Sequence, residues 1–443
     1  MAPCGPGYAS PLAAMKSGPR EKLLYCVCVQ PNTEDGKTDL LATVDVDPES
    51  PTYCQIIHRL RTGNPKDELH HSGWNVCSSC YTPKECCDNP VRDKLILPAL
   101  GSNRVYIVIE PSEMKKLNCS TPHTIHCLAS GEIMISTMGD KDDNGKCDFV
   151  LIDAKTYKMK GTWIKGKNTP KFNYDFWYQP YHDIMVSSEW GAPKVFKTGF
   201  HPSHLTPETY GQHLNFFSWS KRELIQSIDL GREAMAPLEV RFLHNPKESQ
   251  GYVGCAIGGY IYRFYLQPDG KWAAEKVIHI PPKRVSGPDG EFMMDGMITD
   301  ILISLDDRFL YFSNFMHGRV FLGGKIANDP SIKVIEDPEL SEPPKAAYIK
   351  GKRFCGAPQM IQLSLDGRRL YVTSSIFSPW DKQFYPDMVA SGTKMAKIDI
   401  DPVRGGMTLD EDFCVDFDIL EEIVRLTYGW PATKQYAREV TNI

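Results

Sequence analysis

The chain has 443 residues, enough for two or three ordinary domains or for one large ring-shaped domain. Its composition, with 42% hydrophobic and 24% charged residues, is that of a globular protein and excludes intrinsic disorder. The 55 acidic and 50 basic residues leave a formal net charge of −5 without a long run of either sign, which argues against a nucleic-acid groove or a polybasic membrane surface.

Residues 1–22 are predicted to form an irregular N-terminal arm, because Gly, Pro and other small residues dominate this stretch. The arm lacks the apolar stretch of roughly 7–15 residues that a secretory signal requires. No segment of the chain has the roughly 18–20 apolar residues needed to cross a bilayer. These features predict a cytosolic protein, in which the 14 cysteines are thiols rather than disulfides.

Short strands with two-residue alternation are predicted along the chain at 43–47, 149–153, 260–265 and 395–400. The strongest internal signal is a tight polar turn followed by such a strand. Its copies lie at 305–313 and 365–373, with looser copies at 129–136 and 179–187. Asp-Asp and Asp-Gly in the turns supply the positive φ angles of a hairpin, so each copy predicts one hairpin.

A hairpin unit that recurs every 50 to 60 residues or so predicts a β-propeller, because one blade cannot bury both faces unless neighbours flank it. We therefore predict an all-β fold in which 1–443 form a single propeller domain of six or seven blades. The alternative is a pair of β-sandwiches, but no long linker separates two domains. Helical periodicity is scarce, and only 207–212 and 416–426 are predicted as short helices, the latter leading into an atypical tail at 418–443.

Histidines are the candidate functional residues, because several lie at a similar phase of the blade repeat. The candidates are the adjacent His70 and His71, the pair His123 and His126, and, as weaker axial candidates, His244 and His317. Equivalent positions on different blades converge on the axis of a propeller. Convergent neutral imidazoles suit copper, zinc, iron or nickel, and the affinity order favours copper. The alternative is that each histidine is a hydrogen-bonded residue at the end of a strand.

The cysteines are a weaker signal. Cys77 and Cys80 have zinc-knuckle or redox spacing, but no second Cys-x-x-Cys follows, so ordinary or redox-sensitive thiols are favoured. Cys54 lies on a predicted strand near His58, which could lower its pKa, although a buried inert cysteine is the favoured interpretation. The chain has no Walker loop, no Gly-x-Ser-x-Gly and no His-Glu-x-x-His, so hydrolase and nucleotide-enzyme functions lack support.

Five phrases, at 67–75, 77–80, 126–132, 174–180 and 380–387, together closely resemble the selenium-binding protein (methanethiol oxidase) family. The resemblance runs from Cys4 to about Phe417. It implies a seven-bladed propeller, in which some blades can be incomplete. It also implies the oxidation of methanethiol with dioxygen and water to formaldehyde, hydrogen sulfide and hydrogen peroxide at a histidine-bound copper.

On matching motifs, the resemblance implies that His70 and His71 are catalytic copper ligands, joined by either His123 or His126. Cys54 matches the family cysteine proposed to hold selenium. Animal members of the family are also linked to protein transport, to redox regulation, and to nuclear and peripheral-membrane locations.

The chain departs from the family pattern in three places. It is shorter between 104–108 and the His-x-x-His-Cys phrase, and it differs after His317. It also lacks the C-terminal His-Glu-x-Arg-Tyr-Pro-Gly-Gly-Asp-Cys segment that supplies a further copper ligand, and no histidine follows His317. The second hypothesis is therefore a non-catalytic propeller scaffold. A lactonase-like hydrolase ranks last, because the axial candidates are histidines rather than the carboxylates of a calcium site.

Overall fold

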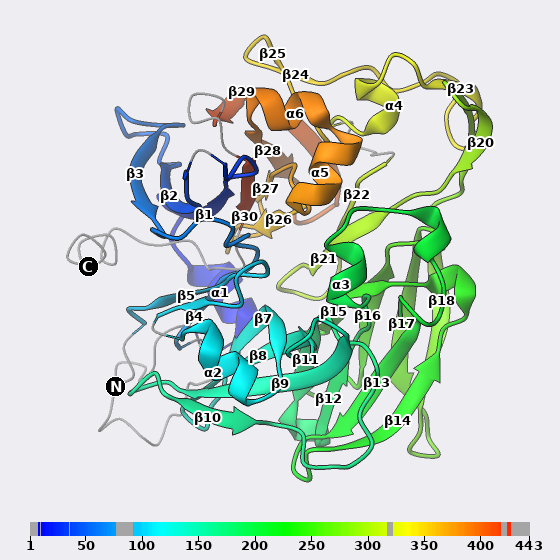
Figure 1. The fold of residues 1–443 in the computed structure, drawn as a ribbon. Coiled ribbons are helices and arrows are strands. Elements are labelled where there is room, and N and C mark those ends of the chain that lie inside the picture. Colours follow the sequence, from blue (N-terminus) through cyan, green and yellow to red (C-terminus); the bar gives the residue numbers. More distant parts are fainter. Residues whose placement is uncertain are drawn as a thin grey trace.

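The computed structural model describes residues 8, 10–34, 36–76, 92–107, 109–316, 322–417 and 423–426. Antiparallel strands dominate these residues, and the sheets stand side by side around a central axis (Figure 1). The chain runs around this ring in order, and the orange and red C-terminal sheet lies next to the blue N-terminal one. The all-β class and the propeller arrangement are confirmed, whereas the number of seven blades and the single domain over 1–443 stay predictions.

Five of the described sheets have four strands each. In ring order they are β1 (Leu23–Val29), β2 (Leu40–Asp45), β3 (Ile56–Arg61) and β30 (Ile423–Leu426); β7 (Ser120–Cys127), β8 (Glu132–Gly139), β9 (Gly145–Asp153) and β10 (Met159–Thr162); β11 (Phe176–Gln179), β12 (Ile184–Ser187), β13 (His213–Ser218) and β14 (Glu223–Asp229); β15 (Pro237–Phe242), β16 (Gln250–Cys255), β17 (Tyr260–Leu266) and β18 (Trp272–His279); and β26 (Ile361–Leu363), β27 (Arg369–Val372), β28 (Lys394–Ile400) and β29 (Met407–Asp416).

Smaller sheets complete the ring and its insertions. They are β4 (Gly73–Trp74), β5 (Leu95–Pro98) and β6 (Val105–Tyr106); β19 (Lys283–Gly287), β20 (Gly290–Met294) and β23 (Lys333–Glu336); β21 (Ile298–Ile303) and β22 (Leu310–Asn314); and β24 (Tyr348–Ile349) and β25 (Lys352–Arg353). Strand β15 lies beside β11 on one side and β21 on the other, β21 lies beside β26, and β4 lies beside β7. The first strand of each of these sheets therefore lies next to the first strand of a neighbouring sheet.

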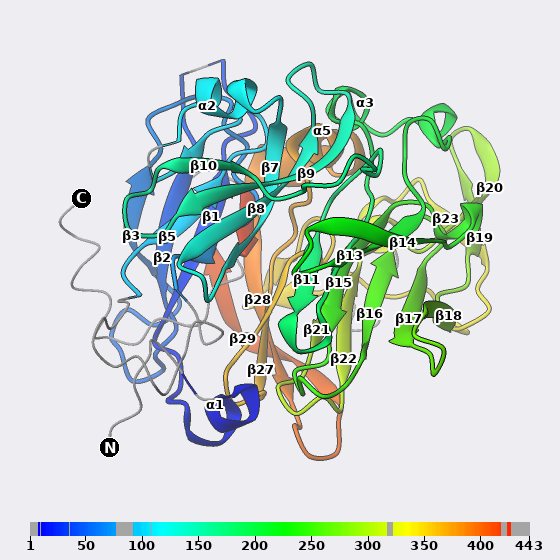
Figure 2. The same ribbon diagram turned by 90° about the horizontal axis from the view of Figure 1, so that it is seen from below.

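The helices are short and lie outside the sheets. They are α1 (Pro11–Ser17), α2 (Pro111–Lys116), α3 (Pro193–Phe196), α4 (Lys325–Asn328), α5 (Ser378–Phe384) and α6 (Pro386–Ser391), with the 3₁₀ turns η2 (Pro180–His182), η3 (Pro202–His204) and η4 (Arg232–Ala234). Figure 2 shows α2, α3 and α5 at one end of the ring and α1 at the other. The candidate site lies near α3 and α5.

The repeated hairpin phrases have one common turn structure. Asp307 and Gly367 take positive φ angles of 61° and 70°, as predicted for the two closest copies. In both turns a serine that the sequence analysis overlooked also accepts two backbone N–H groups through Oγ, Ser304 at 3.1 and 2.9 Å and Ser364 at 3.2 and 3.0 Å. The side-chain hydrogen bonds add to the turn chemistry and place the strand that follows.

Both predicted helices are wrong, and the N-terminal arm is not wholly irregular. Residues 207–212 form a turn without a helix, and 416–426 include the end of β29 and the strand β30. Strand β30 pairs with β1, from Cys26 opposite Leu426 to Val29 opposite Ile423. This pairing with the edge of β1 overrides the helical pattern of the local sequence. Helix α1 begins within the arm because Ser10 Oγ accepts the N–H of Ala13 at 3.0 Å.

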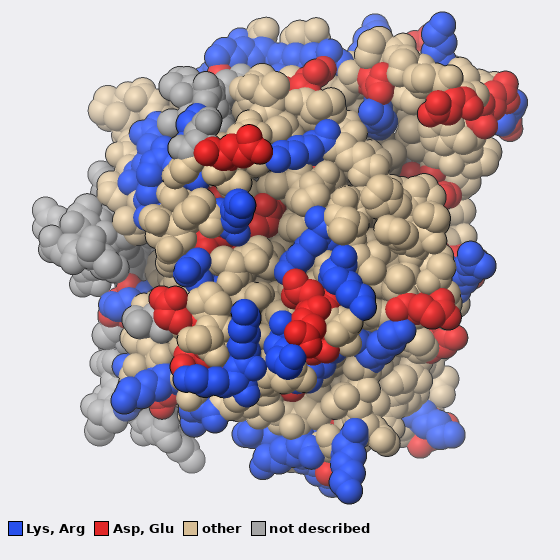
Figure 3. Space-filling view, viewed as in Figure 1, with Lys and Arg blue, Asp and Glu red and all other residues tan. Residues whose placement is uncertain are grey.

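Charged side chains of both signs are interspersed on the face shown in Figure 3, with uncharged residues over much of the area between them. Among the described residues, no helix has the length and apolar character to span a membrane.

Candidate metal centre

Three buried imidazoles converge near the axis of the ring. They belong to His70 and His71, just before β4, and to His123 on β7. One ligand atom from each lies within 4.8 Å of the other two, and the Nε2 atoms of His71 and His123 are 3.0 Å apart. The side chains are at most 3% exposed. Three imidazoles in this arrangement can hold one transition-metal ion.

Backbone anchors position the two adjacent histidines. A carboxylate oxygen of buried Asp39 accepts the N–H of Leu69 at 2.8 Å. On the other side, Gly73 lies so close to β7 that a Cβ there would meet the side chain of Ile125 at 2.9 Å. Glycine is therefore required where the His70-His71 segment passes β7.

A β-bulge positions the third imidazole. The register of β7 with β8 shifts between Pro122 and Ile125, so strict two-residue alternation is broken at His123. The Nδ1 atom of His123 lies 2.9 Å from Thr124 Oγ1, and its ring packs on that of Tyr174 with centroids 3.9 Å apart. These contacts fix the orientation of the ring and leave Nε2 facing His71.

A buried ionic network lies beside the imidazoles. Glu239 Oε1 is 3.8 Å from His71 Nε2, and Glu239 Oε2 accepts a hydrogen bond from Arg241 at 2.7 Å. Arg241 also donates to Asp175 Oδ2 at 2.6 Å. Burial raises the pKa of Glu239 well above its usual range, and the charge of Asp175 adds to the shift. Burial also disfavours ionised Asp175, but the charge of Arg241 and the hydrogen bonds from Glu239 and the Val240 N–H together lower the pKa of Asp175 below its usual value.

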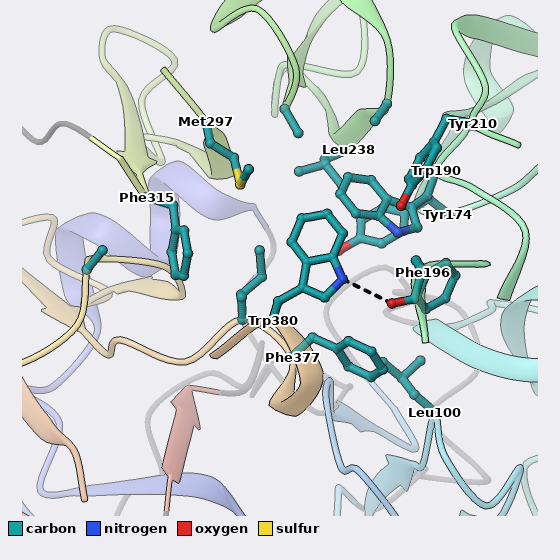
Figure 4. Packing of buried hydrophobic residues seen from close by; sticks show 14 of the residues in the cluster. Leu100, Tyr174, Trp190, Phe196, Tyr210, Leu238, Met297, Phe315, Phe377 and Trp380 are labelled. Atoms are coloured by element: carbon teal, nitrogen blue, oxygen red, sulfur yellow. Dashed lines mark hydrogen bonds between the residues drawn. The ribbon is translucent and has the colours of Figure 1, made fainter. Parts of the chain in front are cut away.

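A cavity of about 30 Å³ opens beside the imidazoles of His70 and His123. Its walls are mostly apolar and include Tyr174, Trp190 and Trp380, which belong to a large buried cluster of aromatic and aliphatic side chains (Figure 4). Two polar side chains, of Thr299 and Gln359, also line it. A cavity needs roughly 10–15 Å³ for each water-sized molecule, so this one has room for a ligand of two or three heavy atoms.

The other predicted histidines lie elsewhere. His126 Nε2 lies 3.0 Å from the carbonyl oxygen of Phe176, so its ring turns away from the cluster. His244 Nδ1 lies 2.8 Å from Asp307 Oδ1, in the hairpin turn before β22. His244 is therefore a hydrogen-bonded residue just beyond the end of a strand, which is the alternative that the sequence analysis left open for it. His317 lies outside the described residues, as do Cys77 and Cys80.

Cys54 lies in the turn before β3 rather than on a strand, with a positive φ of 64°. Its side chain is partly exposed. Burial raises the pKa of this thiol, and the largest opposing effect comes from Lys350, not from His58. The thiol form is therefore favoured, contrary to the effect expected from a nearby histidine.

The sequence analysis missed the carboxylates, the arginine and the cavity walls. Glu239 and Arg241 alternate with buried Leu238 and Val240 on β15. Two charged residues on the same face of an otherwise apolar strand were the signal in the sequence that could have indicated a buried ion pair. Asp175 and Trp380 lie within two of the phrases that carried the family resemblance.

Residues 2–427 match the family model described as 56kDa selenium binding protein (SBP56). The chain belongs to this selenium-binding protein family. It is 52% identical to a methanethiol oxidase of Xenopus laevis and 49% identical to one of Homo sapiens, in each case over 94% of this chain and 93% of the relative. It is 50% identical to selenium-binding protein 2 of Mus musculus, with the same coverage.

A solved structure, the hypothetical selenium-binding protein from Sulfolobus tokodaii, has the same fold. It is 35% identical, with a TM-score of 0.81 over 96% of this chain and 99% of that one. That selenium-binding protein therefore shares this arrangement of sheets, and the sequence-based assignment to the family is confirmed.

Proposed function

We propose that this chain is a copper-dependent thiol oxidase that converts methanethiol, dioxygen and water to formaldehyde, hydrogen sulfide and hydrogen peroxide. The observation that carries the proposal is the cluster of His70, His71 and His123 beside a small apolar cavity. Relatives about half identical over nearly the whole chain are named methanethiol oxidase, which supports the same reaction here.

The residues present fit a copper ion. Buried neutral imidazoles are good copper ligands, and His70, His71 and His123 offer one nitrogen each from a site shielded from solvent. Bound copper would take the sulfur as thiolate and accept electrons that pass to dioxygen. The chain's own residues hold the imidazoles in place through Asp39, the bulge of β7 and the ring of Tyr174, and they keep the cavity small and apolar.

Metal analysis, copper titration and a methanethiol consumption assay test the proposal. We expect one copper per chain in the unaltered protein, and a loss of copper affinity of at least about 10-fold in His71→Ala and in His123→Ala, because each removes a ligand. The matched control is His126→Ala, which removes an imidazole from the same strand outside the cluster and should keep both copper and turnover.

Two outcomes would contradict the oxidase. One is the absence of stoichiometric copper, and the other is unchanged turnover in a protein with both His70 and His71 replaced by alanine. A folded protein that neither binds copper nor consumes methanethiol would favour the scaffold function.

Selenium binding at Cys54 and a cytosolic location are further parts of the proposal. Membership of the selenium-binding family and the partial exposure of Cys54 support the first. Nuclear and peripheral-membrane locations and a role in protein transport rest on the family resemblance alone.

A further inference from the structure

The far wall of the cavity is built around one rigid tryptophan. The Trp380 side chain is 1% exposed and its Nε1 donates a hydrogen bond to the carbonyl oxygen of Phe196 at 3.0 Å. Its ring lies 5.5 Å from that of Trp190 and 5.0 Å from that of Phe200. Figure 4 shows the indole in the middle of the cluster. Held on several sides, it has no room to turn away from a longer ligand.

The wall is continuous with the metal centre. The ring of Trp190 lies 5.8 Å from that of Tyr174, which in turn packs 3.9 Å from the imidazole of His123. A ligand bound beside His123 would therefore share this cavity with Tyr174, Trp190 and Trp380, which line it. A cavity of about 30 Å³ has room for two or three heavy atoms, so a sulfur with one or two carbons fits and a propyl chain does not.

Gln359 marks the same cavity as a ligand site by an independent observation. Its side chain is 2% exposed and lines the cavity, and its Oε1 accepts no hydrogen bond from the described residues. Buried polar atoms are normally satisfied. A water O–H in the cavity, or the S–H of a thiol before it is deprotonated, would supply the donor that this oxygen lacks.

We propose that Trp380 is the specificity-determining residue of this site, because its indole limits the substrate to a thiol of one or two carbons. The inference rests on the proposed function, since it concerns the carbon chain of the thiol that the imidazole cluster would bind.

The first test compares methanethiol and propanethiol as substrates of the copper-loaded protein. In Trp380→Phe, and more strongly in Trp380→Leu, we expect the ratio of kcat/KM for propanethiol to that for methanethiol to rise at least about 10-fold, the effect of an added methylene in an apolar pocket. The matched control is Trp219→Leu, at a tryptophan that packs on another cluster and does not line the cavity, and it should leave the ratio unchanged. A ratio unchanged in folded Trp380 variants overturns the inference.

The second test needs neither copper nor turnover. Ligand-observed NMR on the metal-free protein compares dimethyl sulfide with dipropyl sulfide, two unreactive thioethers. We expect the unaltered protein to bind the first alone and Trp380→Leu to bind both. If the unaltered protein binds dipropyl sulfide as well as it binds dimethyl sulfide, the inference fails even where methanethiol is oxidised. If the size limit holds but methanethiol is not consumed, the proposed function fails and the size-selective cavity stands.

Discussion

His213 and Glu189 form an ion pair where β13 begins, with His213 Nδ1 2.9 Å from Glu189 Oε2. The His213 side chain is 39% exposed and that of Glu189 is 5% exposed. The hydrogen bond to Glu189 raises the pKa of His213 above its usual value, although burial opposes the shift. The folded-state pKa is thus higher than the unfolded one of about 6.5. The pair stabilises the fold fully below the unfolded pKa, and the effect is lost as pH rises through the folded pKa.

We therefore expect His213→Gln to lower the thermal unfolding midpoint more at pH 5.5 than at pH 8.5. The loss is small, within the roughly 0.2–1 kcal/mol typical of solvent-screened pairs. Calorimetry at the two pH values measures the difference. The control is His58→Gln, at a partly exposed histidine that has no ion pair within the described part of the chain. An equal loss at both pH values, or a larger loss at pH 8.5, would show that protonated His213 does not stabilise the fold through its pair with Glu189.

Single residues also show how far the site could be predicted from the sequence. His70 and His71 are adjacent, so their shared place near the axis follows from the order of the chain. The choice between His123 and His126 was left open, because a bulge between Pro122 and Ile125 breaks the alternation on which such a choice depends. The Arg241–Asp175 ion pair was missed because it joins residues 66 positions apart, Arg241 on β15 and Asp175 just before β11.

At the scale of elements, the hairpins were predictable and the helices were not. Each hairpin depends on local turn chemistry, such as the Asp-Gly before β27, and a local sequence suffices to predict it. Helices α5 and α6 are each no more than two turns long, so they depend on packing rather than on helical propensity. Helix α5 is held to distant segments, since Ser378 N–H donates to Glu68 at 2.8 Å and Trp380 donates to Phe196.

Asp381 fixes the segment that enters α5. Its side chain is fully buried and accepts the hydroxyl of Ser375 at 2.7 Å and the N–H of Ile376 at 3.0 Å. Asp381→Ala leaves both donors buried without this acceptor, at a cost of about 1–3 kcal/mol for each. We expect a clear fall in the calorimetric unfolding midpoint. Asp387→Ala, at an exposed carboxylate in the first turn of α6, is the control, and an equally small effect of both substitutions would contradict this role.

At the scale of the whole molecule, the two ends of the described chain meet in one sheet. Strand β30 adds to β1 and completes a four-stranded sheet whose other three strands come from the first 61 residues. An unpaired edge at β1 would leave its N–H and C=O groups without strand partners. This pairing across the full length of the chain is the reason why the local pattern at 416–426 was a poor guide to its structure.

A chain that ends at Phe417 tests this ring closure, because it removes β30 and leaves the backbone of Cys26–Val29 unpaired on that side. We expect a lower unfolding midpoint, faster amide hydrogen exchange at these residues, and concentration-dependent association through the exposed edge. The matched control is a chain that ends at Thr427, which keeps β30. Because both chains lack the residues after Thr427, any difference between them reports on 418–427 alone. Equal midpoints and equal exchange at Cys26–Val29 would mean that the sheets close around the axis by packing without this pairing.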